Sequence, residues 1–317
     1  DSDLPDDPYL TDRLVTYFPT PLRQRYTDRM HEHRLRREIV TTVVVNGYVN
    51  AAGITCFHRL SSETGAPAAE VIRAHIVARA VFGAAGLDAA IAGLDHRVDA
   101  GVQTKLRLEV RTLVERGTRW LINNRRRPLD MGQAVAQLSD GVRAVQEQVP
   151  ALLQGRDKAA YDERRDTYRG AGVPADLAAA VAALPPAYAA LTIVQTARRD
   201  DLPVEQVART HFLLGQHLGL DRLLSRIADL PRDDRWQTMA RAALRDDLHT
   251  AHAALTAEVL AGRPGRPAAD AVTDWVRSTP GVEEVARTLR SVCAGRPDLA
   301  RASVGLRVVR GLLPTIS

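Results

Sequence analysis

The most constraining feature of this 317-residue sequence is an apolar side chain at every third or fourth position along most of its length. Between residues 99 and 124, the helical repeat of about 3.6 residues gathers these side chains on one face. A second stripe of this kind runs over 204–218. The pattern predicts a chain of amphipathic helices that pack against one another. The first stripe consists of Val102, Leu106, Val110, Leu113, Val114 and Leu121.

One stretch resembles a strand. Residues 39–46, IVTTVVVN, are rich in the β-branched residues that favour sheets. Because helical periodicity continues on both sides, we interpret the stretch as a buried helix. Aromatic residues make up only 4% of the chain, and the small apolar residues that dominate suit closely packed helices. The expected fold class is all-α, an orthogonal or bundle-like array of many helices.

The length allows one large domain or two medium ones, and we place a division near residue 150. This gives an N-terminal helical subdomain, 1–150, and a C-terminal one, 151–317. Cys56 and Cys293 are far apart and match no metal-binding or redox spacing, so reduced thiols and a cytoplasmic location are expected. No apolar run approaches the roughly 20 residues of a membrane-spanning helix, and no membrane association is expected.

The tripeptide Arg-Asp-Asp occurs three times, at 199–201, 232–234 and 245–247. Paired carboxylates beside an arginine suit a metal site or acid–base chemistry, but they also suit a helix start, where an aspartate accepts backbone N–H groups. We favour the structural interpretation. An apolar stripe from Trp236 to Ala251 follows the second copy, which predicts a buried Trp236 and a largely exposed Asp246.

Motifs that would carry chemistry are missing from the sequence. The segment His31–His33 and the pair His249 and His252 have short spacings, but no further ligand completes a metal set. Neither a glycine-rich nucleotide loop nor a serine nucleophile elbow occurs. The sequence therefore predicts no catalytic, cofactor-binding or metal-binding residue. Gly53, within NAAGIT at 50–55, is interpreted as a point of close helix approach.

Residues 202–223 offer an alternative function, because two amphipathic runs separated by a glycine are typical of a helix-turn-helix. The second run carries Asp221, Arg222 and Arg226, a mixed set of charges that is poorly suited to DNA. The formal charge of the whole chain is +5, but acids and bases alternate along it. A free-standing module that binds nucleic acid or protein therefore stays open as the alternative, with nucleic acid the less favoured partner.

Several blocks resemble the C-terminal helical region of the large bacterial NAD-specific glutamate dehydrogenases, and they occur in the family's order. The resemblance covers most of the chain up to about residue 260. The blocks are DDPYLTDRLVTYFPTPLRQRY (6–26), HRLRREIVTTVVVNGYVNAAGIT (33–55), SSETGAPAAEVIRAHIVARAVFG (61–83), GTRWLINNRRRPLD (117–130) and LPRDDRWQTMARAALRDDL (230–248).

The resemblance implies that this chain is one part of a much longer enzyme. That enzyme would oxidise L-glutamate to 2-oxoglutarate and ammonia, with NAD as the hydride acceptor. The family's catalytic lysine, acid–base aspartate and nucleotide loop match nothing here, so no catalytic residue is carried over and no NAD is expected on this segment. The implied role is a helical domain that braces the catalytic core or a homo-oligomer.

Residues 33–82 carry apolar side chains on more than one helical face, as in Val43–Val45. A helix that is apolar all round is normally buried on several sides. We therefore expect an exposed apolar patch of roughly several hundred Å² along these residues, where the catalytic core or a sister subunit docks.

Overall fold

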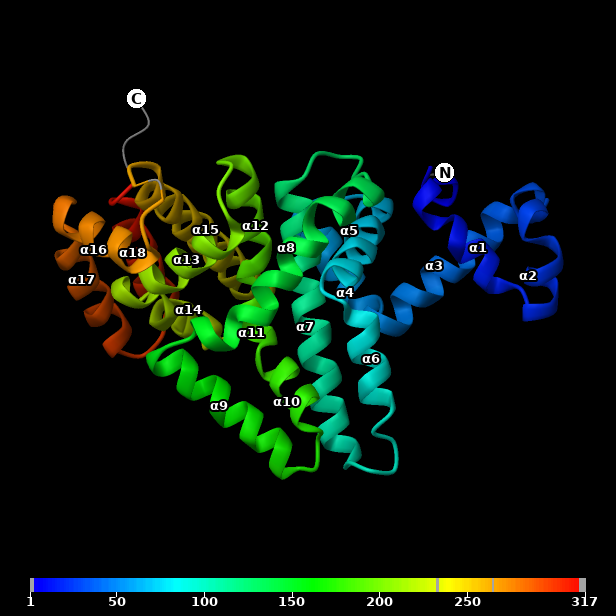
Figure 1. Cartoon of the computed structure of the whole chain (residues 1–317), viewed down its shortest axis with the longest axis horizontal. Helices are drawn as coiled ribbons and strands as arrows, with labels where there is room; N and C mark the ends of the chain where they lie inside the picture. Colours follow the sequence, from blue (N-terminus) through cyan, green and yellow to red (C-terminus); the bar gives the residue numbers. More distant parts are fainter. Residues whose placement is uncertain (1–2, 232–233, 264, 314–317) are drawn as a thin grey trace. The chain divides into compact units, whose positions relative to one another are not determined.

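The computed structural model describes residues 3–231, 234–263 and 265–313 (Figure 1). Within these ranges the regular structure consists of α-helices and short 3-10 helices, with no strand, which confirms the all-α class. The β-branched stretch 39–46 lies inside α3 (Arg36–Ala52), as predicted. Val40 and Val44 are buried there, so α3 places part of this stretch in the core.

The chain divides into two compact units, Asp1–Ser139 and Asp140–Ser317. The division falls within α8 (Met131–Leu152), whereas the sequence placed it near residue 150, at the other end of the same helix. α8 contributes apolar side chains to both units. Its completely buried residues are Met131, Leu138, Val142, Val145 and Val149.

The N-terminal unit is built around α5 (Ala68–Val81) and α7 (Ala100–Asn124), which pack extensively against each other. α5 is enclosed on nearly all sides, with additional contacts from α3, α4 and α6. The first part of α3 packs against the short helices that precede it. The other elements of this unit are η1 (Leu4–Asp6), η2 (Pro8–Leu10), α1 (Thr11–Tyr17), α2 (Thr20–Tyr26), η3 (Thr27–Glu32), α4 (Ile54–Thr64) and α6 (Ala84–Ala92).

Gly53 forms a sharp corner between α3 and α4, whose axes are bent by 93°. Its φ of +78° lies in a region that residues with a side chain rarely adopt. A Cβ atom at this position would also lie 2.7 Å from Nη2 of Arg111 on α7. A close helix approach at Gly53 is not seen: the atoms nearest to this position belong to the Arg111 side chain, and the glycine instead supplies the positive φ of the corner.

The C-terminal unit surrounds α13 (Val204–Leu218) and the long α15 (Arg235–Ala261), which pack against each other. The last three helices pack on this pair and on α14, and they complete one apolar core with it. Residues beyond 260 are therefore part of this core. The other helices are α9 (Gly155–Gly170), α10 (Ala175–Ala182), α11 (Leu184–Ala187), α12 (Ala189–Arg199), α14 (Leu220–Ala228), α16 (Ala268–Ser278), α17 (Val282–Ala294) and α18 (Leu299–Arg310).

The prediction that Trp236 is buried is wrong, because 70% of its surface is exposed. The apolar stripe of α15 changes environment along the helix: Ala243 is exposed, while Leu248 and Ala251 are buried. Periodicity identified the apolar face correctly, but in the described part of the chain the first half of that face is covered only in part: Met239 and Ala240 are half-buried, while Trp236 is exposed.

The Arg-Asp-Asp copies have structural roles, as favoured from the sequence. Asp234 is the N-cap of α15, and its carboxylate accepts the backbone N–H of Gln237 at 2.7 Å. Arg232 and Asp233 lie outside the described residues. Asp247 is exposed and pairs with Arg310 at 3.2 Å.

The prediction that Asp246 is largely exposed is wrong. Asp246 is half-buried beside Arg245, with 3.3 Å between Nη2 and the carboxylate. In the remaining copy, Arg199 pairs with Asp200 at 2.8 Å, immediately after α12. Each pair joins an arginine to a single carboxylate, which is an ordinary ion pair and no metal-binding arrangement.

Candidate functional site

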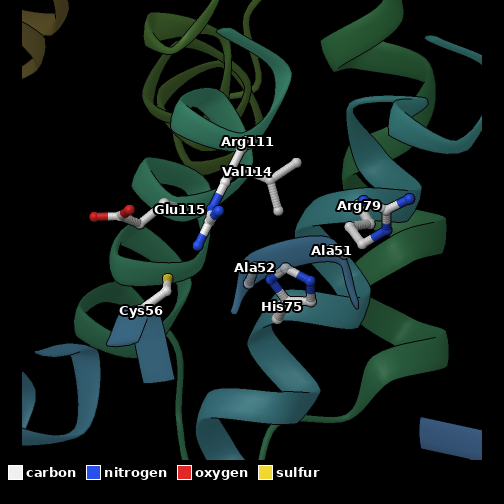
Figure 2. A pocket seen from close by; sticks show the side chains of 8 residues that line it. All are labelled: Ala51, Ala52, Cys56, His75, Arg79, Arg111, Val114 and Glu115. Atoms are coloured by element: carbon white, nitrogen blue, oxygen red, sulfur yellow. The ribbon is translucent and has the colours of Figure 1, made fainter. Parts of the chain in front are cut away.

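A small pocket lies at the Gly53 corner of the N-terminal unit, between α3, α4, α5 and α7, and we call it the corner pocket (Figure 2). α5 supplies His75 and Arg79 one helical turn apart, so both reach the same side of that helix. α7 supplies Arg111 and Glu115 with the same spacing. The lining residues are Ala51, Ala52, Cys56, His75, Arg79, Arg111, Val114 and Glu115.

His75 is the most unusual residue of the corner pocket. Only 3% of its surface is exposed, yet neither Nδ1 nor Nε2 has a hydrogen-bond partner in the described structure. Burial, together with the charges of Arg79 and Arg111, lowers the pKa of His75 to about 3, so the ring is neutral at physiological pH. A buried polar atom without a partner costs about 1–3 kcal/mol. A ligand or solvent atom in the pocket would remove that cost.

Tyr48 and Cys56 flank the histidine. The rings of Tyr48 and His75 meet edge to face, with 4.5 Å between their centroids. Burial is the main cause that raises the pKa of both the Tyr48 hydroxyl and the Cys56 thiol. Since the thiolate is the nucleophilic form of cysteine, a raised pKa leaves Cys56 a poor nucleophile. This side of the pocket is suited to packing and not to covalent chemistry.

The charged residues of the corner pocket differ in their pairing. Arg79 pairs with Asp88 at 2.7 Å. Glu115 pairs with Arg59 and lies 3.7 Å from Arg119. In contrast, Arg111 has no ion-pair partner among the residues that the structure describes, and Figure 2 shows its guanidinium reaching toward the space between Cys56 and His75.

Among the residues that the structure describes, the pocket therefore combines a neutral imidazole without a hydrogen-bond partner and an arginine without an ion-pair partner. A histidine with a pKa of about 3 is a weak base at neutral pH. No group of three histidine, cysteine or acidic residues within the described ranges is placed to hold a metal ion. The arrangement is suited to binding, and an anion is the ligand that the charges favour.

The sequence predicted no site at the residues that line this pocket. It identified Cys56 only as an expected reduced thiol, and Gly53, at the corner itself, as a point of close helix approach. The short histidine spacings predicted no site. His31 lies in η3 and His33 is the C-cap of that helix, and both are exposed. His252 instead stacks on His211 in the C-terminal core, with 3.6 Å between the ring centroids.

The helix-turn-helix interpretation of 202–223 is not supported. α13 and α14 are separated by Gly219 alone, and both pack into the core of the C-terminal unit. Leu220 and Leu223 are completely buried, and Arg226 donates to the carbonyl oxygen of Cys293 at 2.9 Å. A recognition helix must present a free polar face to the major groove. α14 instead uses most of its surface within the fold.

Two further observations concern the chain as a whole. Cys56 and Cys293 are both free and buried. Within the described ranges, no single helix has the length and apolar character needed to cross a membrane, while three bent helix pairs meet that requirement by length and composition alone.

Comparison with known proteins identifies related sequences over nearly the whole chain. The family model described as "Glutamate dehydrogenase, C-terminal" matches residues 1–311, including the segment after about residue 260, where the sequence analysis identified no resembling block. The NAD-specific glutamate dehydrogenase of Mycobacterium tuberculosis is 36% identical over 317 residues, covering 99% of this chain and 19% of the relative.

Two other bacterial relatives agree. The NAD-specific glutamate dehydrogenase of Halomonas elongata is 36% identical over 89% of this chain, and that of Pseudomonas aeruginosa is 37% identical over 83%. This chain spans only 16–19% of the length of these three relatives. From its helical fold and from the family match to residues 1–311, the chain belongs to the glutamate dehydrogenase C-terminal family.

Proposed function

We propose that this chain is a non-catalytic helical domain of a large NAD-dependent glutamate dehydrogenase, and that it braces the catalytic core of that enzyme. The parent reaction would be oxidation of L-glutamate, with NAD and water, to 2-oxoglutarate, ammonia and NADH. Support comes from the relatives, which are named as NAD-specific glutamate dehydrogenases and are about five times longer than this chain. NAD would bind elsewhere in the parent, in a cytoplasmic homo-oligomer.

The observation that carries the docking role is the apolar face of α3. Val45 and Val49, one helical turn apart, are 41% and 44% exposed. Ile54, directly after the corner, is 71% exposed. These residues fall within 33–82, the segment for which the sequence predicted an exposed patch, whereas α5 in the same segment is enclosed within its own unit. Adjacent exposed apolar side chains are typical of an interaction surface.

The test places charges on this face within the full-length dehydrogenase. The double variant Val45→Asp, Val49→Asp should leave the helical domain folded, because both side chains already face solvent there. In the parent it should weaken subunit assembly or glutamate oxidation by at least about tenfold, because a carboxylate would have to be desolvated at the contact. Sedimentation and the steady-state rate of NADH formation measure the two effects.

The matched control is the double variant Asn46→Asp, Asn50→Asp. It adds the same charge with the same spacing on exposed positions of the same helix. We expect the parent enzyme to tolerate it better than the valine variant. Equal effects from both variants would show that α3 responds to charge in general, and full activity of the valine variant would overturn the docking role.

A further inference from the structure

We propose that the corner pocket is a binding site for a small oxyanion, either a carboxylate or a phosphate group, held by the guanidinium of Arg111 and the ring of His75. This proposal is independent of the docking role of α3. It names a ligand-binding site within the N-terminal unit.

The imidazole of His75 lacks hydrogen-bond partners in the described structure. A neutral histidine offers one N–H donor and one acceptor nitrogen, and in His75 both are buried without a partner in the described structure. His252 shows the alternative in the same chain, since its Nε2 lies 2.8 Å from the carbonyl oxygen of His211. The free nitrogens of His75 therefore mark a place where an atom from outside the chain fits.

The charges around the pocket favour an anion. Arg79 is balanced by Asp88, and the carboxylate of Glu115 is shared by Arg59 and Arg119. Arg111 contributes a further positive charge beside the pocket. A cation would be repelled by this arrangement, while an oxyanion would gain a charge-assisted hydrogen bond from the planar guanidinium.

The shape of the site also suits an oxyanion. Arg111 extends over the corner, and its Nη2 occupies the space that a side chain at position 53 would need. The glycine therefore keeps that space open for the guanidinium. The pocket has room for about one water molecule, which is the size of one oxygen atom of an oxyanion. Because Arg111 is exposed to solvent, the rest of the bound molecule would stay in solvent.

The test is a titration of this chain at pH 7, followed by the imidazole ¹⁵N signals in NMR spectra. Sodium acetate and inorganic phosphate are the probes, and sodium chloride at the same ionic strength is the blank. The spectrum of His75→Phe assigns the His75 signals. We expect acetate or phosphate to shift these signals saturably, while chloride does not. Saturation by acetate would assign a carboxylate ligand, and saturation by phosphate a phosphate group.

Two arginine variants of α7 make the test specific. Arg111→Ala should weaken the affinity at least about tenfold, as expected for the loss of a hydrogen bond between charged groups. Arg107→Ala removes the same charge one turn away, where the arginine lies 3.9 Å from Asp95 outside the pocket. It should change the affinity by no more than about twofold.

Three results would overturn the proposal. The signals of His75 could stay unchanged up to high probe concentration, which would mean that the pocket holds only water. They could respond equally to chloride, which would indicate general ionic screening. The two arginine variants could also weaken binding equally, which would place the anion elsewhere on α7. None of these results depends on dehydrogenase activity, so they leave the proposed function untouched.

Discussion

The two units of this chain bury histidines in opposite ways. In the C-terminal unit, His211 and His252 stack with 21° between their ring planes, enclosed by apolar helices. Nε2 of His252 lies 2.8 Å from the His211 carbonyl oxygen, and Nδ1 of His211 lies 3.3 Å from the Thr256 hydroxyl. In the N-terminal unit, neither ring nitrogen of His75 has a hydrogen-bond partner in the described structure, and His75 lines the corner pocket together with Arg79 and Arg111.

The contrast shows what distinguishes a structural histidine from a candidate ligand-binding one. The carbonyl oxygen of His211 can only accept, so Nε2 of His252 carries the proton. The Thr256 hydroxyl donates to the His252 carbonyl oxygen at 2.8 Å, so it accepts from Nδ1 of His211. Both tautomers are therefore fixed from within the chain. Burial alone is common to all three histidines, and the difference lies in their partners.

The largest expected effect comes from replacing His252 with phenylalanine. His252→Phe should lower the free energy of unfolding by about 2–4 kcal/mol, because it loses the bond to His211 and overpacks a site against Gly215. A Cβ atom at Gly215 would already lie 2.8 Å from Cε1 of His252.

His75→Phe is the matched variant in the other unit. It should lower the free energy of unfolding by no more than about 1 kcal/mol, because no hydrogen bond is lost and two buried nitrogens without a partner in the described structure are removed. Urea denaturation measures both variants. Equal losses of unfolding free energy would mean that hydrogen-bond partners do not distinguish His75 from His252.

Acidification gives the next largest effect. Burial lowers the pKa of His252 to about 4 and shifts that of His211 in the same direction. An unfolded histidine titrates near 6.5, so below that pH the unfolded chain binds protons that the folded chain excludes. Stability should be constant above about pH 7 and fall between about pH 6.5 and 4.

The size of this loss follows from the shift. At pH 5 the contribution of His252 alone is about 2 kcal/mol. His75, whose pKa is about 3, acts in the same direction. His75→Phe should therefore reduce the acid sensitivity without abolishing it. Urea midpoints at pH 7 and pH 5 give the values, and a midpoint that does not move would contradict neutral, buried histidines.

A smaller loss than that of His252→Phe is expected at Thr256. Thr256→Val keeps the shape of the side chain but leaves Nδ1–H of His211 without its acceptor. We expect a loss of about 1–2 kcal/mol in the free energy of unfolding. Thr250→Val on the same helix is the control, because the Thr250 hydroxyl is exposed and bonds only to the Asp246 carbonyl oxygen. If both variants cost the same, Thr256 does not hold the histidine pair.

More of the fold than of the candidate site could be predicted from the sequence. Periodicity identified the helical faces, and the neighbours of 39–46 outweighed its β-branched residues, because tertiary packing overrides local propensity. The error at Trp236 has a physical cause: a stripe shows which side of a helix is apolar, but not whether another element covers it. The half-burial of Asp246 likewise depends on neighbours that no local pattern specifies.

The corner pocket was beyond reach of the sequence for a different reason. His75, Arg79 and Arg111 lie on two helices, and each is ordinary within its own helix. They form a candidate binding site because the chain bends at Gly53 and because Asp88 and Arg59 pair with other charges of the pocket. In addition, His75 has no hydrogen-bond partner in the described structure. Missing partners and compensated charges are properties of the packed molecule.

Calorimetric titration of this chain with NAD tests most directly whether it supports the chemistry of a glutamate dehydrogenase without taking part in it. The sequence contains no glycine-rich nucleotide loop, so we predict no saturable binding at micromolar NAD. A dissociation constant in the micromolar range would contradict the account, because it would place a nucleotide site within these helices.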